Sequence, residues 1–166
     1  DFFRISVKVD RQMVALDDEL ELLEAYMDLM CYRYPNLHCE YDIDPDLGGS
    51  LVPNFILQPL VENSLLHGLK NKGYRGEVVI TAKKEGNAIE ILIRDSGSGF
   101  TDGRKDIIDE MLLHYDKKQA KLEGNSIGIL NVQKRIKLLC GPKYGLSYME
   151  NETGGVTARL LLPHEE

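Results

Sequence analysis

The chain has 166 residues, of which 43% are hydrophobic, so it is long and apolar enough for one domain with a substantial core. Its formal net charge of −7 argues against a protein that binds nucleic acid or a membrane surface, because such proteins present a basic patch. Three cysteines without C-x-x-C spacing indicate a reducing compartment rather than a disulfide framework or a zinc site. The sequence shows neither a signal peptide nor an apolar run of the roughly 18 residues that span a membrane.

The chain begins with a short segment and a long predicted helix. Residues 1–15 alternate only loosely, and we expect a linker or an edge strand that continues from an upstream domain. Residues 16–34 are predicted to be a helix, because apolar side chains recur there at helical spacing. Asp18 and Glu21, three residues apart, resemble a capping box at its start. Pro35 ends the helix.

A second helix is predicted from Pro53 to residue 70, since a proline at the first helical position loses no hydrogen bond. At about 100° per residue, Asn63, His67 and Lys70 fall on one narrow stripe. An amide, an imidazole and an ammonium on one face suit a charged ligand, although a lone histidine is often a satisfied, partly buried residue. Glu62, one step round the helix, is either a general base or a solvated carboxylate.

The rest of the chain predicts a sheet with further helices. Alternating apolar residues and turn signals at residues 85–87 and 154–155 indicate two hairpins. The predicted fold is α+β, a two-layer sandwich in which a mixed, mostly antiparallel sheet packs on about three helices, with residues 16–166 as one domain. The predicted strands are residues 38–43, 77–84, 88–94, 146–150 and 156–162, and the later helices are residues 106–115 and 129–139.

Two glycine clusters need an explanation. Asp95, Gly97 and Gly99 form D-x-G-x-G at a strand end, where the aspartate can accept from an exocyclic amine and the glycines let a flat ring or a phosphate approach. The alternative is a simple turn. The second cluster, G-x-S-x-G at residues 124–128, precedes a helix, whose first N–H groups and dipole favour an anion. Loops are often rich in glycine, however, and neither the dinucleotide fingerprint nor a Walker A motif occurs.

The three clusters resemble a known family when they are taken together. Glu62-Asn63 with His67, the D-x-G-x-G at residues 95–99 and the G-x-S-x-G at residues 124–128 resemble, in this order, the N, G1 and G2 boxes of the GHKL ATPase superfamily. Leu-Gln-Pro-Leu-Val-Glu-Asn-Ser at residues 57–64 is similar to a signature of the YesM-like sensor histidine kinases, and Gly-Ile-Leu-Asn-Val-Gln-Lys-Arg-Ile at residues 128–136 is similar to that subclass too.

The resemblance implies a Bergerat-type histidine kinase ATPase fold with ATP and Mg²⁺ as ligands. It assigns the metal to Asn63, the neighbourhood of the phosphates to His67 and Lys70, and assistance of phosphoryl transfer to Glu62. Asp95 is implied to bind the adenine amino group, supported through water by Thr157. The remaining implied parts are Gly97 and Gly99, which open the pocket, a lid at residues 100–124, and Gly124, Ser126 and Gly128, which close over the phosphates.

The resemblance also implies a partner domain. None of the four histidines, His38, His67, His114 and His164, suits a phosphoacceptor. The implied acceptor therefore lies on an upstream dimerisation domain of a homodimeric parent, which passes the phosphoryl group to a response regulator. The fragment is then the cytoplasmic part of a membrane-bound bacterial sensor, without nucleic-acid or membrane contact of its own. Ser96 and Ser126 depart from the usual box residues. The alternatives are an ATP-driven conformational module and a non-catalytic ATP-sensing regulator.

Overall fold

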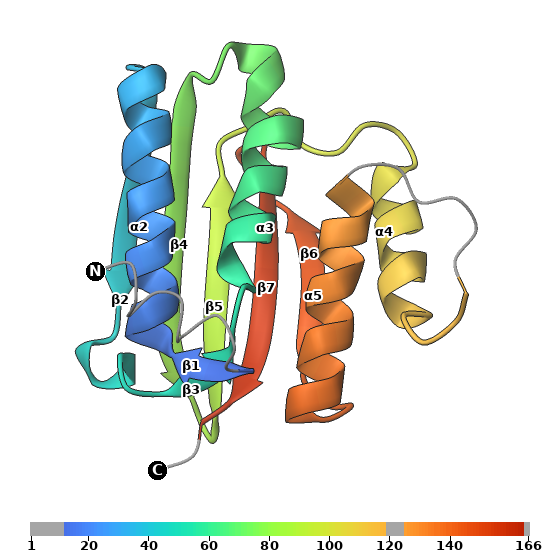
Figure 1. The fold of residues 1–166 in the computed structure, drawn as a ribbon. Helices are drawn as coiled ribbons and strands as arrows, with labels where there is room; N and C mark the ends of the chain where they lie inside the picture. Colours follow the sequence, from blue (N-terminus) through green and yellow to red (C-terminus); the bar gives the residue numbers. More distant parts are fainter. Residues whose placement is uncertain (1–11, 119–124, 165–166) are drawn as a thin grey trace.

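The computed structural model describes residues 12–118 and 125–164. A five-stranded sheet with the order β2-β4-β5-β7-β6 forms one layer, and helices cover one of its faces (Figure 1). Only the pair β2–β4 is parallel among these neighbours; the other three are antiparallel. The predicted α+β fold is confirmed. The strands are β2 (Leu37–Ile43), β4 (Gly76–Glu85), β5 (Ala88–Asp95), β6 (Gly145–Glu150) and β7 (Val156–Pro163).

Three helices lie side by side over the sheet: α2 (Leu16–Arg33), α3 (Leu57–Asn63) and α5 (Asn125–Cys140) (Figure 1). The helix α4 (Arg104–Leu113) lies beyond α5 at one edge of this layer. The core forms between the layers, because alternate strand residues face the helices and are fully buried. These include Ile80, Ile93, Ile91 and Leu160, which pair in register across three neighbouring strands.

A small second sheet corrects the predicted start of the central helix. The strands β1 (Met13–Ala15) and β3 (Leu51–Pro53) are antiparallel partners, so Pro53 belongs to a strand and the helix α3 begins four residues later at Leu57. Pro59 then lies in the first turn, where its missing N–H removes no helical hydrogen bond. The remainder of the predicted linker, residues 1–11, lies outside the described residues.

Two other helix starts also differ from the predictions. The helix α2 begins after Ala15 without a side-chain cap, so the capping box predicted at Asp18 and Glu21 is wrong. The acidic first turn still complements the helix dipole. The helix α5 begins at Asn125, four residues before the predicted start. A short 3₁₀ turn, η1 (Pro45–Leu47), completes the loop between β2 and β3.

Candidate active site

The helix that carries Asn63 changes its hydrogen-bonding pattern immediately after that residue. It continues as a π-helix, η2 (Ser64–Leu69), and then as a 3₁₀ turn, η3 (Lys70–Lys72). Wide π turns of this kind are rare and are frequently found at functional sites. The regular spacing of 100° per residue, which predicted one stripe for Asn63, His67 and Lys70, therefore does not describe this segment.

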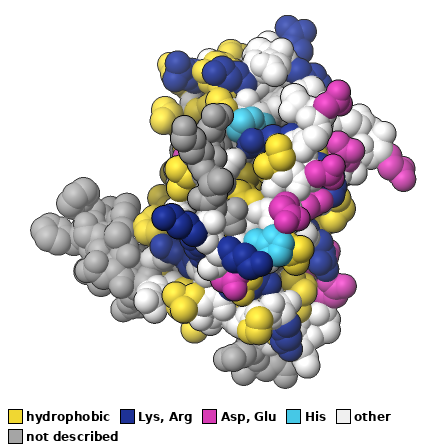
Figure 2. All heavy atoms as spheres, turned by 90° about the vertical axis from the view of Figure 1, so that its right-hand side faces the viewer, with side chains coloured by type: hydrophobic (Ala, Val, Ile, Leu, Met, Phe, Trp, Pro, Cys, Tyr) yellow, Lys and Arg dark blue, Asp and Glu magenta, His cyan; other side chains and the backbone are white. Residues whose placement is uncertain are grey.

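Those three side chains nevertheless meet at one pocket of about 390 Å³. Its size is that of a small-ligand site. Figure 2 shows the side of the molecule that carries α4, where lysine and arginine side chains gather around histidine. One wall of the pocket comes from α3, η2 and η3, and the other comes from the loop after β5 and from α4. The lining residues are Asn63, Leu66, His67, Lys70, Asn71, Gly99, Phe100, Thr101, Arg104 and Ile108.

Asn63 offers the pocket a buried oxygen. Its side chain is only 7% exposed, and its Oδ1 atom has no hydrogen-bond partner among the described residues. Buried polar atoms are nearly always paired, so an orphaned carbonyl oxygen in a pocket indicates a ligand. An amide oxygen of this kind fits Mg²⁺, which binds few protein ligands and keeps waters or phosphate oxygens. Within residues 12–118 and 125–164, no cluster of three or more His, Cys, Asp or Glu could hold a metal by itself.

Arg104 contributes a cation that the sequence analysis missed. It lies at the start of α4, lines the pocket, and donates from Nη2 to the Ser126 hydroxyl at 3.2 Å. In the described part of the chain, no carboxylate forms an ion pair with it. Burial lowers the pKa of His67, and the nearby Arg104 cation lowers it further. Unneutralised positive charge that faces a pocket favours an anionic ligand. Only its place in the predicted lid pointed to Arg104.

Asp95 lies beside the pocket rather than in its lining. Its side chain is 3% exposed at the end of β5, and Oδ1 accepts the N–H groups of Gly97 (2.9 Å) and Val156 (3.2 Å). Burial raises the pKa of this carboxyl, against the effect of the two N–H donors. The aspartate is thus fixed by the loop after β5 and by the first residue of β7, and its orientation is set before any ligand arrives.

Glycines make this close approach possible. A Cβ atom on Gly97 would lie 2.4 Å from the backbone oxygen of Gly68, and a Cβ on Gly68 would lie 2.8 Å from Asp95 Oδ1. A Cβ on Gly155 would lie 2.0 Å from the Asp95 carbonyl oxygen. The Gly68 carbonyl also accepts the N–H of Ser98 at 3.2 Å. Gly97 was among the predicted site residues, whereas no role was predicted for Gly68 or Gly155.

Thr157 reaches Asp95 through another side chain. Its buried hydroxyl donates to Asn151 Oδ1, and the Asn151 amide donates to the Asp95 carbonyl oxygen at 3.1 Å. Thr157 therefore supports the backbone at Asp95. The water-mediated link to the carboxylate stays a prediction. Asn151 is a further supporting residue that was not predicted from the sequence.

Glu62 and Ser96 do not line the pocket. Glu62 is exposed on α3 and accepts from Gln58 Nε2 at 3.0 Å. The Ser96 hydroxyl, in the place of the usual asparagine, accepts the N–H of Glu77 at 2.8 Å, and the Ser96 carbonyl accepts from Lys72 at 2.9 Å. Ser96 thus fastens the end of β5 to the start of β4.

The third predicted cluster lies in α5 rather than before it. Ser126 and Gly128 occupy the first turn of the helix, where backbone N–H groups have no partner within the helix. Ser126 is buried, and an added Cβ on Gly128 would meet only Pro59, at 3.8 Å. Gly124, the first member of the cluster, lies outside the described residues.

The predicted lid contains a well-packed helix. Ile108, Met111 and Leu112 are buried on the inner side of α4. Gln133 of α5 donates to the Leu112 carbonyl at 3.2 Å and accepts the N–H of Leu146 at 2.8 Å, so it links α4 to β6. In the described ranges, no helix is long and apolar enough to cross a membrane.

Sequence comparison agrees with this architecture. Residues 53–166 match the family of histidine kinase-, DNA gyrase B- and HSP90-like ATPases. The chain is 31% identical to the sensor protein LytS of Oceanobacillus iheyensis over 165 residues, which are 98% of this chain and 27% of the relative. It is 32% identical to the sensor histidine kinase YpdA of Escherichia coli over 152 residues, which are 91% and 25% of the two chains. The chain thus spans about a quarter of these relatives.

Solved structures share the fold. The catalytic domain of histidine kinase ThkA has a TM-score of 0.66 and 15% identity, over 91% of this chain and 94% of that chain. ThkA in complex with the response regulator protein TrrA has a TM-score of 0.62 and 16% identity, over 92% and 41% of the two chains. The family match covers most of the chain, including α3, β5 and α5, and confirms the resemblance to the GHKL superfamily. The chain belongs to the histidine kinase-, DNA gyrase B- and HSP90-like ATPase family.

Proposed function

We propose that this domain binds Mg²⁺-ATP in the pocket beside η2 and transfers the γ-phosphoryl group to a histidine on an upstream domain of the same parent protein. One observation carries the proposal: Asn63, whose buried Oδ1 has no hydrogen-bond partner among the described residues, lines a pocket that has Lys70 on one wall and Arg104 on the other. A hard oxygen ligand together with two cations is complementary to a metal-bound polyphosphate. The names of the relatives LytS and YpdA support a sensor kinase.

The chemistry requires little covalent participation by the protein. Phosphoryl transfer is catalysed mainly by positioning and by electrostatic stabilisation of the equatorial oxygens. Asn63 would hold Mg²⁺, which supplies charge neutralisation between the phosphates when it is bound. His67 and Lys70 from the helix side and Arg104 from the lid side would fix the phosphate oxygens. Ser126 and Gly128 would add helix N-terminal N–H groups.

The base of the nucleotide would bind next to Asp95, whose carboxylate is held by two backbone N–H groups and retains acceptor capacity on Oδ2 for an exocyclic amine. Gly97 and Gly99 leave room for the ring. Glu62 is exposed outside the pocket, which suits a base that acts on a group presented by another domain. It would accept a proton from the incoming histidine or orient its ring.

The acceptor histidine would come from elsewhere in the parent. Among the described histidines, His38 is exposed in β2, His67 lines the pocket, His114 pairs with Glu110 at 3.0 Å, and His164 interacts with Ser50 at 3.3 Å. We expect none of them to be the acceptor of the phosphoryl group. An upstream dimerisation domain, a homodimeric parent at the bacterial membrane with this domain in the cytoplasm, and a response regulator partner complete the proposal, the last supported by the ThkA–TrrA complex.

The test compares three fates of labelled ATP. The parent protein, with its upstream segment, is incubated with Mg²⁺ and ATP labelled at the γ-phosphate. Acid-labile, base-stable label on the protein is the expected result, since phosphohistidine has that stability. Release of inorganic phosphate without labelled protein would instead identify a conformational ATPase. Tight binding without either product would identify an ATP-sensing regulator.

A substitution tests the metal ligand directly. Asn63→Ala should remove the dependence of ATP affinity on Mg²⁺, because the variant loses the only buried amide oxygen among the described residues that line the pocket. Asn87→Ala, in the turn between β4 and β5, makes the same chemical change at an exposed site and is the control. An unaltered magnesium response in Asn63→Ala would refute the metal role.

A further inference from the structure

Glu19 makes an unusual contact for a residue in the first turn of a helix. Its side chain is 5% exposed, and its carboxylate leaves α2 to accept three backbone N–H groups at the start of α3. The distances are 2.6 Å to Phe55, 3.1 Å to Ile56 and 3.3 Å to Leu57. A buried carboxylate is stable only when its oxygens are paired in this way.

The contact replaces a cap that α3 lacks. Ile56 is the N-cap residue of α3, and it provides no side-chain hydrogen bond to the helix. The first N–H groups of a helix need acceptors, and a negative charge there is favoured by the helix dipole. Glu19 meets both requirements although it is 38 residues from Leu57 in the sequence.

A cation from α5 holds the same turn from the other side. Arg135 Nη1 donates to the backbone carbonyl of Asn54 at 2.7 Å and to the Asn54 side-chain oxygen. The next residue, Phe55, has φ of +56°, a left-handed backbone conformation that residues other than glycine rarely adopt. The turn before α3 is therefore fixed by contacts with α2 and α5, and not by its own backbone preference.

The turn is also bonded to the segment by which the chain enters the domain. The N–H of Asn54 donates to the Gln12 carbonyl at 3.0 Å, and the N–H of Leu16 donates to the Ser50 carbonyl at 2.8 Å. These bonds flank the β1–β3 pair (Figure 1). The start of α2, the small sheet and the start of α3 thus form one hydrogen-bonded unit.

We propose that Glu19 is a positioning residue for the nucleotide site. Its carboxylate fixes where α3 begins, and a helix of seven residues transmits that position to Asn63 at its other end. The metal-binding oxygen is thereby placed relative to the segment that leads in from the upstream domain. This role rests on the proposed function, because it acts through the ligand that Asn63 binds.

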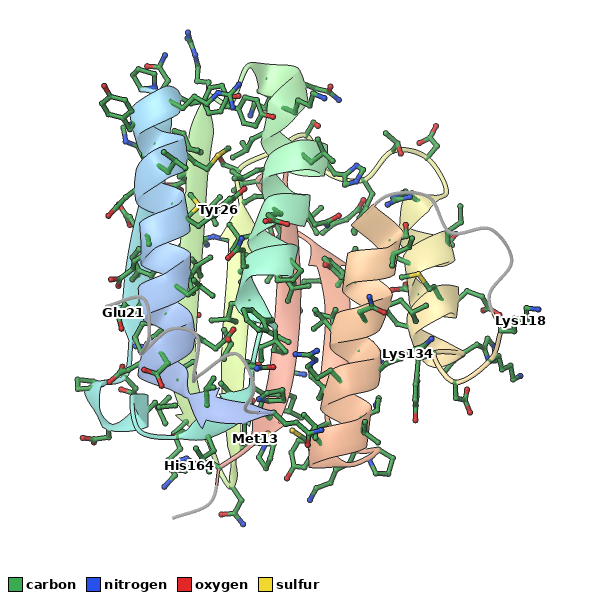
Figure 3. All side chains as sticks on the ribbon, in the orientation of Figure 1. Met13, Glu21, Tyr26, Lys118, Lys134 and His164 are labelled. Atoms are coloured by element: carbon green, nitrogen blue, oxygen red, sulfur yellow. The ribbon has the colours of Figure 1, made fainter. Side chains whose placement is uncertain are left out.

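Glu19→Gln tests the role with almost no change in size. The amide keeps one acceptor oxygen, but its NH₂ group faces the converging N–H donors and its charge is lost. We expect Mg²⁺-ATP affinity to fall at least fivefold, measured by titration of the full chain below its unfolding temperature. Glu21→Gln makes the same change on the exposed side of α2, away from α3 (Figure 3), and should alter the affinity less than twofold.

A stability control separates positioning from folding. Met27→Ala removes a buried side chain from α2, and its loss in Tm should equal or exceed that of Glu19→Gln. Its affinity for Mg²⁺-ATP should remain within twofold of the wild type. If Glu19→Gln lowers only Tm and leaves the affinity unchanged, the carboxylate is merely structural and the proposal is wrong.

A double-mutant cycle identifies the route through Asn63. If Glu19 acts by positioning that oxygen, Glu19→Gln should weaken Mg²⁺-ATP binding much less in an Asn63→Ala background than in the wild type. Equal effects in both backgrounds would overturn the route. Arg135→Lys weakens the hydrogen bonds between α5 and the same turn, so it should also lower the affinity for Mg²⁺-ATP. This variant replaces Glu19→Gln in the test if Glu19→Gln does not fold. Absence of nucleotide binding by the wild-type chain would count against the proposed function, a result distinct from any of these.

Discussion

The two walls of the pocket are held in different ways. The helix wall, which carries Asn63, His67 and Lys70, is fixed by the carboxylate of Glu19 at one end of its helix and by backbone packing of Gly68 against Gly97 at the other. The lid wall, from Gly99 to Ile108, is held by the buried apolar side of α4 and by side-chain hydrogen bonds to α5, of which only the one from Arg104 to Ser126 involves a side chain that lines the pocket.

This difference separates two tasks. Contacts between backbone atoms cannot shift without a clash, so the helix wall keeps the Asn63 side-chain oxygen and Asp95 in place. A guanidinium that donates to a serine hydroxyl can exchange that acceptor for a phosphate at little cost. The Arg104 side chain of the lid wall is therefore suited to respond to the ligand, and the helix wall is suited to define where the ligand lies.

The largest effect is expected where the helix wall is tightest. Gly97→Ala would place a Cβ 2.4 Å from the Gly68 backbone oxygen, and the domain should lose about 1–3 kcal/mol in free energy of unfolding. Gly128→Ala, near the lid wall, has space and lies in a helix, so it should gain about 0.5–1 kcal/mol. Urea denaturation of both variants measures the contrast. Similar changes in the free energy of unfolding for the two variants would show that the two walls accept an added Cβ atom equally well.

Asp95→Asn should weaken ATP binding by roughly 10- to 100-fold, because a charged acceptor for the adenine amine is lost. Inosine triphosphate, which lacks that amine, should bind the wild type and the variant almost equally. Asp102→Asn, an exposed position in the lid, is the control. An equal loss of affinity for both nucleotides in Asp95→Asn would mean that the carboxylate does not contact the amine.

Arg104→Ala should lower ATP affinity by about fivefold, which corresponds to about 1 kcal/mol for a partly exposed ion pair. Its Tm should change little, since the apolar side of α4 remains packed. The matched control is Lys105→Ala, one residue later, where the ammonium pairs with Asp109 at 2.6 Å outside the pocket lining. Loss of affinity in the control variant alone would place the phosphates elsewhere.

The smallest effect concerns His67. Removing the neighbouring cation in Arg104→Gln should raise the pKa of His67, measured by NMR titration of its ring, whereas Lys105→Gln should not. Because the folded protein binds this proton less well than the unfolded chain, acidification through the range just below 6.5 removes stability. That loss should be smaller in Arg104→Gln. An unchanged pKa in that variant would show that the two side chains do not interact.

The elements that local patterns specify were predicted well. Hydrophobic alternation gave the antiparallel pairs β4–β5 and β6–β7, and helical spacing gave α2 within one residue of its observed end. The boxes around Asn63 and Asp95 were predicted because side-chain type and glycine spacing are visible in the sequence. The structure brings them together on neighbouring elements.

Long-range pairing explains the errors. A proline such as Pro53 is common at the start of a helix, but residues 51–53 instead form a strand that pairs with residues 13–15. The local sequence does not reveal this pairing. Glu19 looks like an ordinary acidic residue of a first turn, whereas its partners lie at residues 55–57. Arg104 has no signature of its own, because its role depends on the pocket that the folded chain creates.

The π-helix η2 cannot be replaced by a regular α-helix without moving residues of the site. Forcing Ser64–Leu69 into a regular α-helix without removing a residue would put about one residue fewer in that turn. Everything after the segment would then be out of phase with Asn63 by about one residue, or about 100° about the helix axis. Lys70 and Gly68 would leave their places, and the close contact with the end of β5 would be lost. The wide turn is therefore a phase shift that any stabilised redesign of this helix must preserve.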